Sequence, residues 1–467
     1  MGRRDPRHLC PSLAGPCPQR LVLPQRQWPV AAQVLIAVEL SIGDLTHDGR
    51  GVARDEGGKT VFVTGALPGE RVVTRRVKRG RRYDEAVALE VLEASPQRVQ
   101  PACPHYGQCS GCVLQHLAHP QQLQAKQHVL AENLQRLGGV TPERWLDPLP
   151  SQPWGYRRRA RLSVRFVAKK GRTLVGFREL NASFVADIQQ CPVLDPRLSA
   201  LLPPLAECID GLSLRAAIPQ VEVSAGDTQV AMLIRHLQPP TVDDEARLRS
   251  FAETHSVALY LQSAGPDSVH WFAGAPAGLS YALPDEGVDY DFGPSDFIQV
   301  NAGLNQAMVA QAMAQLDPQP GEAILDLFCG LGNFSLPLAR RGARVTGVEG
   351  SPELVARARA NAERQGLSVD FQAADLTQDG RAQSWATQRW DRILLDPPRA
   401  GAAGVLEYLP GPEGAERIVY VSCHPGSLAR DAGTLVRQHG YRLSAAGVMD
   451  MFPHTAHVES MAVFDRG

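Results

Sequence analysis

The 467-residue sequence has no long apolar run and no excess of charge of either sign. No apolar stretch reaches the roughly 18–20 residues that a membrane-spanning helix needs, so we expect no membrane association. The first twenty residues lack the continuous apolar segment of a secretory signal, which favours a cytoplasmic protein. With 42 Gly and 36 Pro, the composition also falls short of low complexity. A largely disordered or collagen-like chain is therefore excluded, and the length indicates two to four domains.

The balance of 48 Lys and Arg against 49 Asp and Glu hides two basic clusters. Seven basic residues lie between Arg71 and Arg82, and five arginines lie between Arg157 and Arg165. Locally positive faces attract phosphate backbones even when the whole molecule is neutral. Such runs also occur on ordinary solvated surfaces, so they favour nucleic acid as a partner without settling the matter.

Patterning divides the chain into four parts. Residues 1–33 are rich in Pro, Arg and Gln without an apolar period, which predicts a disordered extension. Residues 34–97 alternate short strands with Gly/Asp turns, which predicts a small antiparallel barrel. Residues 98–290 contain a cysteine-rich loop, a helical segment within 117–148 and an α+β pattern. Residues 291–467 alternate strand-like and helix-like segments, which predicts a mostly parallel sheet covered on both faces.

Seven strand-like segments make up this last part, and the first ends in Asp326, before a turn with Gly330 and Gly332. A nucleotide approaches the backbone at such a turn of an open α/β sheet. Glu349 ends the second strand, where a carboxylate can accept hydrogen bonds from both ribose hydroxyls, and Asp375 after the third can meet an adenine amino group. Acids at three strand ends suit a ligand with ribose, adenine and a cationic centre. We therefore expect S-adenosylmethionine, with a nicotinamide cofactor as the alternative.

The fourth and fifth strands end in residues with reactive side chains. LLDPPRAG places Asp396 before two prolines, which fix the backbone and leave the carboxylate facing the pocket. This pattern is typical of nucleic-acid methyltransferases that use an amino nitrogen. RIVYVSCHPG places Cys423 at the end of the next strand, where a thiolate can act as a nucleophile.

A cysteine thiol at this position is what methylation of a uracil carbon would require. C5 of uracil is a poor nucleophile, but addition of a thiolate to C6 makes an enolate that can attack a methyl group. A general base must then remove the C5 proton. Glu459, in an otherwise apolar last strand with His454 and His457 nearby, is our candidate for this base. The target base must leave its stack to reach such a pocket.

Four cysteines indicate a metal site. Cys103, Cys109 and Cys112 have the spacing C-x5-C-x2-C, and Cys191 follows at a distance. A trio with one distant cysteine favours a [4Fe–4S] cluster over zinc, which usually pairs C-x2-C with a second C-x2-C. Disulfides are less expected in a chain without a secretion signal.

Several segments together resemble one family over residues 35–467, the bacterial 23S rRNA (uracil-5-)-methyltransferases. The segments that carry the resemblance are GVARDEGGKTVFVTGALPGE, CPHYGQCSGCVLQHL, SDFIQVN, LDLFCGLGNFSLPLA, LLDPPRAG, VSCHPGSLARD and HVESM. The resemblance implies an N-terminal OB-like TRAM barrel that binds RNA, a central α+β domain with an iron–sulfur loop of four cysteines, and a C-terminal Rossmann-like, seven-stranded methyltransferase domain.

The resemblance also implies roles for individual residues. The S-adenosylmethionine site would be lined by Gln299, Phe328, Asn333, Glu349, Asp375 and Asp396, with Cys423 as nucleophile and Glu459 as base. The substrate would be 23S rRNA, with no obligate protein partner; another RNA, either tRNA or a second rRNA site, is the alternative. Two positions depart from the family pattern, namely His424 in place of Asn and Ser110 in place of Gly.

Two other hypotheses stay open at this point. An amino-group N-methyltransferase that uses DPPR would leave Cys423 dispensable. A redox or RNA-binding protein would use the cluster as its active element.

Overall fold

The structure, a computed structural model, describes residues 21–22, 37–180, 182–275, 278–409 and 414–467. The chain forms two compact units. The first contains residues 1–107 and 113–121, and the second contains residues 108–112 and 122–467.

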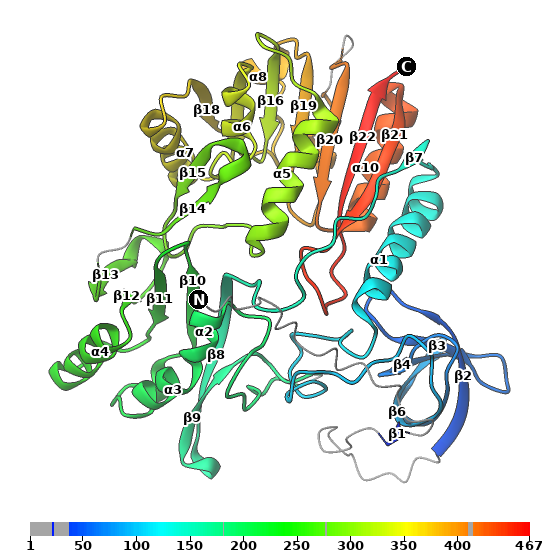
Figure 1. The fold of residues 1–467 in the computed structure, drawn as a ribbon, viewed down its shortest axis with the longest axis vertical. Helices are drawn as coiled ribbons and strands as arrows, with labels where there is room; N and C mark the ends of the chain where they lie inside the picture. Colours follow the sequence, from blue (N-terminus) through cyan, green and yellow to red (C-terminus); the bar gives the residue numbers. More distant parts are fainter. Residues whose placement is uncertain (1–20, 23–36, 181, 276–277, 410–413) are drawn as a thin grey trace, which may run out of the picture. The chain divides into compact units, whose positions relative to one another are not determined.

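The first unit contains a closed barrel. Its strands are β2 (Ala37–Leu45), β3 (Gly51–Arg54), β4 (Thr60–Thr64), β5 (Arg71–Arg79) and β6 (Tyr83–Glu93). Strand β6 pairs with β5 on one side and with β4 on the other, so the order β6-β4-β3-β2-β5 closes on itself (Figure 1). The pairs are antiparallel except β4–β6, which is parallel. Alternate residues point inward to a small apolar core that includes Val61, Val63 and Val91.

The middle of the chain forms a mixed sheet with helices packed against it. The strands are β8 (Arg159–Val167), β9 (Arg172–Gly176), β10 (Gln220–Ala225), β11 (Val230–Arg235), β12 (Val257–Gln262) and β13 (His270–Ala273). Their order in the described residues is β13-β12-β11-β10-β8-β9, an order that the sequence pattern did not predict. The helices are α2 (Pro196–Ala200), α3 (Leu202–Asp210) and α4 (Val242–Thr254). A separate hairpin of β14 (Ser280–Leu283) and β15 (Val288–Asp291) follows.

The C-terminal sheet is the largest of the molecule's described sheets. Its strands are β7 (Arg144–Trp145), β16 (Ala323–Leu327), β17 (Arg344–Glu349), β18 (Val369–Ala373), β19 (Arg392–Leu395), β20 (Arg417–Ser422), β21 (Tyr441–Met449) and β22 (Glu459–Arg466). They lie in the order β18-β17-β16-β19-β20-β22-β21-β7 (Figure 1). Strands β16 to β20 are parallel, and β22 is antiparallel to both of its neighbours. This is the Rossmann-like arrangement with a reversed last strand.

Both faces of this sheet are buried. The helices that cover it are α1 (His119–Asn133), α5 (Ala302–Leu316), α6 (Ser335–Arg340), α7 (Pro352–Arg364), α8 (Ser384–Thr387), α9 (Ala403–Leu406) and α10 (Pro425–His439). Ile324 of β16 lies in one apolar core with residues of α5, α6 and α7, whereas its neighbour Leu325 lies in another with residues of α1, α8, α9 and α10. Period-two alternation between two cores explains why these strands are apolar throughout.

Some predictions need correction or stay untested. The sheet has β7 in addition to the seven predicted strands, because two exposed residues show no strand pattern. The helical segment after the cysteine loop continues past α1 as a π-turn (Leu134–Gly138) and ends at Gly139 in the left-handed conformation. Of the predicted disordered extension, only the two-residue strand β1 (Leu21–Val22), which pairs with β6, is described. The domain boundaries stay predictions. Among the described residues, no helix is both long and apolar enough to cross a membrane.

Candidate active site

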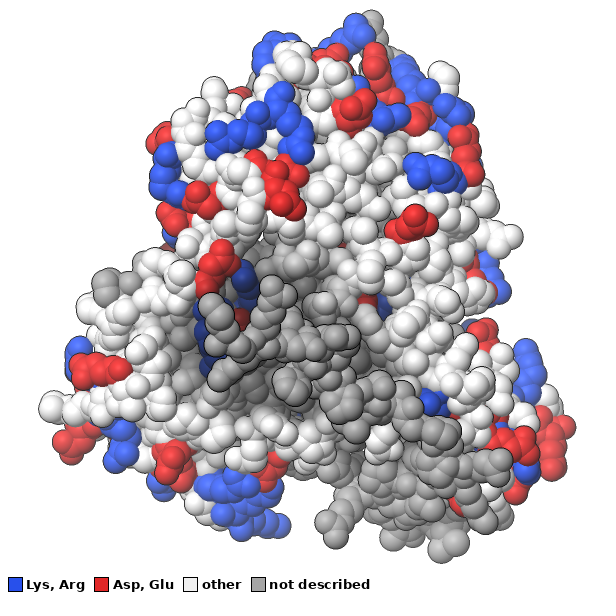
Figure 2. All heavy atoms as spheres, in the orientation of Figure 1, with Lys and Arg blue, Asp and Glu red and all other residues white. Residues whose placement is uncertain are grey.

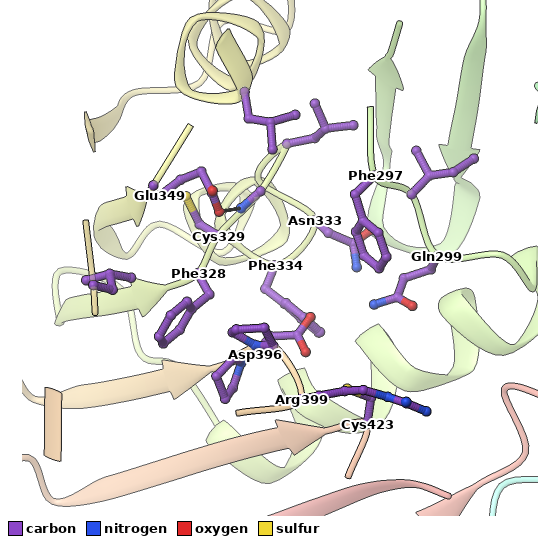
Figure 3. Close-up of a pocket in the computed structure, with 18 of the residues that line it drawn as sticks. Phe297, Gln299, Phe328, Cys329, Asn333, Phe334, Glu349, Asp396, Arg399 and Cys423 are labelled. Atoms are coloured by element: carbon purple, nitrogen blue, oxygen red, sulfur yellow. Dashed lines mark hydrogen bonds between the residues drawn. The ribbon is translucent and has the colours of Figure 1, made fainter. Parts of the chain in front are cut away.

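A pocket of about 660 Å³ lies at the carboxyl ends of β16, β17, β19 and β20. Open parallel sheets bind ligands at this edge, since the strand order reverses between β16 and β19. Figure 3 shows side chains from the turn after β16, from the end of β17 and from the segments after β19 and β20 around this pocket. The lining includes every predicted catalytic and cofactor-binding residue: Gln299, Phe328, Asn333, Glu349, Asp375, Asp396, Cys423 and Glu459.

The turn after β16 brings the backbone to the pocket. Phe328, Gly330 and Gly332 have φ values of +63°, +56° and +85°, which are unusual for a residue as large as Phe328. A Cβ on Gly332 would lie 2.7 Å from a side-chain carbon of Leu336, so glycine is required there. The backbone N–H of Gly330 donates to Glu349 (3.1 Å), which holds this carboxylate at the pocket wall. A positive φ at a residue other than glycine, as at Phe328, is a backbone strain that is typical of ligand-binding sites.

Asn333 is fixed by neighbours that the sequence patterns did not indicate. Its side-chain amide exchanges two hydrogen bonds with that of Asn305 in α5, at 2.9 and 3.0 Å. The hydroxyl of Tyr281, in β14, also donates to Asn333 (3.0 Å). Asn305 and Tyr281 are buried in segments whose sequence pattern is otherwise apolar. From the sequence alone, a residue there that holds a neighbouring side chain cannot be told from a residue of the hydrophobic core.

Cys423 and Glu459 meet because β20 and β22 pair in antiparallel register. Ser422 lies opposite Ser460, so the residue after Ser422 and the residue before Ser460 are also neighbours. Directly opposed residues of an antiparallel pair have Cα atoms about 4.5–5.5 Å apart. A thiol and a carboxyl group, 36 residues apart in sequence, therefore share one wall of the pocket.

Burial and mutual repulsion shift the pKa values of these acids. Burial raises the pKa of Asp396 to about 7. Burial and the charge of Asp396 raise the pKa of Glu459 to about 8, against the opposing effect of Lys126 and Arg399. Burial, then Glu459 and Asp396, raise the pKa of Cys423 to about 11. Perturbed groups clustered in one cleft are characteristic of a catalytic site.

Two cationic or titratable side chains complete this wall. Arg399, from the DPPR segment, contacts Nδ1 of His457 through a guanidinium nitrogen (2.6 Å). Burial and the neighbouring Arg399 lower the pKa of His457 to about 4, so its imidazole is neutral at pH 7. Both line the pocket, whereas His454 and Asp326 do not. Asp326 is fully buried and accepts a hydrogen bond from Ser335 (2.5 Å), a contact that supports the turn from behind.

The two departures from the family pattern have local structural explanations. His424 is the N-cap of α10, and its Nδ1 accepts the backbone N–H of Ser427 (3.1 Å), as an asparagine oxygen would. Ser110 is exposed, and both its N–H and its hydroxyl donate to the carbonyl of Arg178 (3.0 Å each).

The four cysteines predicted to hold the iron–sulfur cluster are divided between the two units, with Cys103 in the first and Cys109, Cys112 and Cys191 in the second. Cys109, Cys112 and Cys191 all lie against the apolar core of the middle sheet. The backbone N–H of Gly111 points at Cys109 Sγ (3.4 Å), and hydrogen bonds from His105, Gln115 and Tyr106 oppose the burial that raises the pKa of Cys103. Such donors suit thiolate ligands. However, in the described part of the chain no group of three or more His, Cys, Asp or Glu side chains is arranged to hold a metal ion.

Two family models match the chain. The model described as tRNA (uracil-5-)-methyltransferase matches residues 118–466, and the TRAM domain model matches residues 37–81, within the closed barrel. The first match covers the whole C-terminal sheet and the pocket.

Curated relatives match over almost their full length. The chain is 56% identical over 431 residues to "23S rRNA (uracil(1939)-C(5))-methyltransferase RlmD" of Xanthomonas campestris pv. campestris, which is 92% of this chain and 97% of that protein. The protein of the same name from Stenotrophomonas maltophilia is 55% identical, and the match again covers 92% of this chain and 97% of that protein.

A solved structure shows the same fold over most of the chain. The tRNA (uracil-54, C5)-methyltransferase of Pyrococcus abyssi, crystallised with S-adenosyl-L-homocysteine, has a TM-score of 0.69 and 26% identity. The match covers 92% of this chain and all of that one. The chain is therefore an enzyme of the RNA (uracil-5-)-methyltransferase family and carries an N-terminal TRAM domain.

Proposed function

We propose that the protein transfers a methyl group from S-adenosylmethionine to C5 of one uridine in 23S rRNA. The observation that carries the proposal is the shared wall of Cys423 and Glu459, at the carboxyl end of a sheet whose Gly-rich turn lies beside them. The curated relatives at 55–56% identity are named for uridine 1939, and we propose the corresponding uridine as the target.

The pocket has the size and chemistry for the methyl donor. Glu349, held by Gly330, retains carboxylate lone pairs for ribose hydroxyls, and Phe328 offers an apolar surface to the adenine. Asp396 supplies negative charge for a sulfonium centre. The bound donor supplies an electrophilic methyl group, and the remaining chemistry belongs to side chains of this chain.

The proposed reaction begins at sulfur. The Cys423 thiolate forms a bond to C6 of the uracil, and the electron pair of the C5–C6 double bond moves toward O4. C5 then attacks the methyl group as the bond from that group to the sulfonium sulfur breaks, leaving S-adenosylhomocysteine. Glu459 takes the C5 proton, and the resulting electron pair restores the double bond as the C6–sulfur bond breaks.

Two variants test this mechanism. Cys423→Ala should abolish methyl transfer while S-adenosylmethionine still binds, because the thiol does not hold the donor. Glu459→Gln should instead accumulate a covalent protein–RNA adduct, visible as a shifted band on a denaturing gel. Normal turnover by Cys423→Ala would refute the covalent mechanism and favour methylation of an amino nitrogen.

A tRNA substrate is the second candidate, because the matching family model and the Pyrococcus structure are both named for tRNA. Identity to that structure is 26%, against 55–56% for the relatives named for 23S rRNA. Mapping 5-methyluridine in 23S rRNA and tRNA from cells with and without the protein distinguishes the two. Loss confined to tRNA would overturn the rRNA proposal.

We propose that Cys103, Cys109, Cys112 and Cys191 ligate a [4Fe–4S] cluster. The support is the spacing in the sequence, together with the N–H groups aimed at Cys109 and Cys103. Anaerobic purification followed by iron and sulfide analysis should give about four of each per chain in the wild type. Cys109→Ser should lower both, and iron retained at the wild-type ratio would contradict its assignment as a ligand.

A further inference from the structure

The segment 450–458 joins β21 to β22 and forms part of the pocket wall. Phe452 and His457, within it, and Glu459, which follows it, all line the pocket. Met449 and Glu459, at its two ends, lie opposite each other in the β21–β22 pair. The position of the proposed base therefore depends on how this segment is held.

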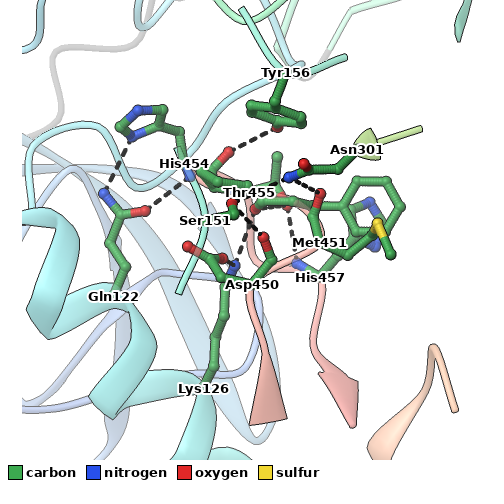
Figure 4. A network of polar contacts seen from close by, with 12 residues as sticks. Gln122, Lys126, Ser151, Tyr156, Asn301, Asp450, Met451, His454, Thr455 and His457 are labelled. Carbon is green, nitrogen blue, oxygen red and sulfur yellow. Dashed lines mark hydrogen bonds and ion pairs between the residues drawn. The ribbon is translucent and has the colours of Figure 1, made fainter. Parts of the chain in front are cut away.

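Four consecutive carbonyl groups of the segment each accept a hydrogen bond from a side chain elsewhere in the chain (Figure 4). The carbonyl of Asp450 accepts from Ser151 (2.8 Å), and that of Met451 accepts from Asn301 (3.4 Å). The carbonyl of Phe452 accepts from Lys126 (2.9 Å), and that of Pro453 accepts from Tyr156 (3.0 Å). Such a set of contacts fixes the backbone far more closely than a surface loop requires.

Lys126 makes a second contact with the segment. Its Nζ also donates to the carboxylate of Asp450 (2.7 Å), and both side chains are at most 3% exposed. Removing two charges from water is costly, and buried ion pairs seldom repay that cost in stability. The pair is better explained by what it positions, because it fixes the first residue of the segment to helix α1.

Gln122 lies one helical turn before Lys126 on the same side of α1. Its side-chain oxygen accepts the backbone N–H of His454 (2.8 Å), and its Nε2 contacts Nδ1 of the same histidine (3.2 Å). His454 has a φ of +68°, which is unfavourable for a histidine without such support. The two residues of α1 therefore hold the segment at its start and at its turn, as Figure 4 shows.

We propose that Gln122 and Lys126 are positioning residues that hold the 450–458 segment so that Glu459 faces the uracil C5 proton. This inference rests on the proposed covalent mechanism. Cys423 and Asp396 come from the ends of β20 and β19, which α1 does not hold through these contacts. Loss of the anchor should therefore slow proton removal while thiolate attack and methyl transfer continue.

The experiment compares three variants of the full-length protein. Gln122→Met removes both hydrogen bonds to His454 at similar volume and leaves no charge unpaired. The double variant Lys126→Met/Asp450→Asn removes both buried charges together. Gln124→Met is the matched control, because Gln124 is an exposed residue on the same helix. Each is assayed for kcat, KM for S-adenosylmethionine and covalent RNA adduct, beside wild type, Cys423→Ala and Glu459→Gln.

We expect kcat to fall at least tenfold in Gln122→Met and in the double variant, with KM for S-adenosylmethionine within twofold of wild type. Both should accumulate the covalent adduct seen with Glu459→Gln, and Gln124→Met should match wild type. Wild-type kcat without adduct in Gln122→Met would overturn the proposal, and so would a fall in kcat without adduct. If the double variant does not fold, Gln122→Met decides the outcome.

The controls separate this inference from the mechanism on which it rests. If Cys423→Ala still methylates RNA, the covalent mechanism itself fails. If Glu459→Gln traps the adduct and Gln122→Met does not, only the positioning role is wrong.

Discussion

At the scale of single residues, charge on one acid of the pocket controls the reactivity of another. The pKa of Cys423 is raised to about 11 by burial first and by the charge of Glu459 second. At neutral pH the free protein therefore stores a thiol rather than a thiolate. The thiolate that attacks C6 is a minor form of Cys423 in the free protein at this pH.

Neutralising Glu459 should make Cys423 more reactive. In Glu459→Gln the repulsion from the carboxylate is gone, so the pKa of Cys423 falls and more thiolate is present at pH 9. We expect several-fold faster alkylation of the Cys423 peptide by iodoacetamide at this pH, followed by mass spectrometry to exclude the other cysteines. Glu363→Gln, at an exposed position of α7, is the control and should leave the rate unchanged. An equal rate in both variants would show that Glu459 does not contribute to the raised pKa of Cys423.

Activity should rise with pH up to about 8. Glu459 has a pKa of about 8 and accepts a proton only when it is ionised, so the ionised fraction is roughly 1% at pH 6 and about half at pH 8. The charged or titratable groups that face it are Asp396, Arg399, Lys126 and Cys423. We expect kcat, which includes proton removal from the covalent adduct, to rise about ninefold from pH 6 to 7 and about fivefold from pH 7 to 8. RNA binding measured at each pH is the control. A flat profile over this range would contradict proton transfer to Glu459.

At the scale of elements, the sequence predicted the residues at strand ends better than the residues that hold the active-site side chains in place. Asp396 and Cys423 follow long apolar strands, so their place at the carboxyl edge of a parallel sheet could be inferred from period and length. The role of Lys126 could not be inferred, because a single lysine among glutamines in a helix is typical of a solvent-exposed helix face. Asn305 was hidden for the opposite reason, as one polar residue within an apolar helix.

The cap of α10 shows how a departure from a family pattern can preserve a function. His424 directly follows the proposed nucleophile, and its Nδ1 accepts the backbone N–H of Ser427. His424→Ala should lower the free energy of unfolding by about 1 kcal/mol, the usual cost of a lost N-cap, and should also reduce methyl transfer. His424→Asn restores an acceptor and should stay within about 0.5 kcal/mol of wild type. Urea unfolding and turnover measure both effects, and equal stability of His424→Ala and wild type would contradict the role of the cap.

At the scale of the whole molecule, the near-zero net charge conceals a surface on which opposite charges lie close together. Figure 2 shows basic and acidic side chains interspersed over the visible face. In the first basic cluster, Arg71, Arg76 and Lys78 each pair with a carboxylate. No ion pair is found in the described residues for the others, which are Arg75, Arg79, Arg81 and Arg82. Sequence clustering predicted a basic surface, but pairing in the fold decides which of its charges are available to phosphate.

The barrel arginines that have no ion-pair partner among the described residues should contribute more to RNA binding than the paired cations. Arg81→Gln/Arg82→Gln removes two cations that have no carboxylate partner among the described residues. It should weaken binding of a 23S rRNA fragment and reduce the slope of log K against log salt concentration by about 1.5, at roughly 0.7–0.9 per phosphate contact. Arg71→Gln/Lys78→Gln is the matched control, because both of its cations already pair with carboxylates: Arg71 with Glu39 and Glu93, and Lys78 with Glu85. Salt titrations by fluorescence anisotropy measure both slopes. Equal losses in the two double variants would mean that total charge, rather than its pairing on the barrel, governs the encounter with RNA.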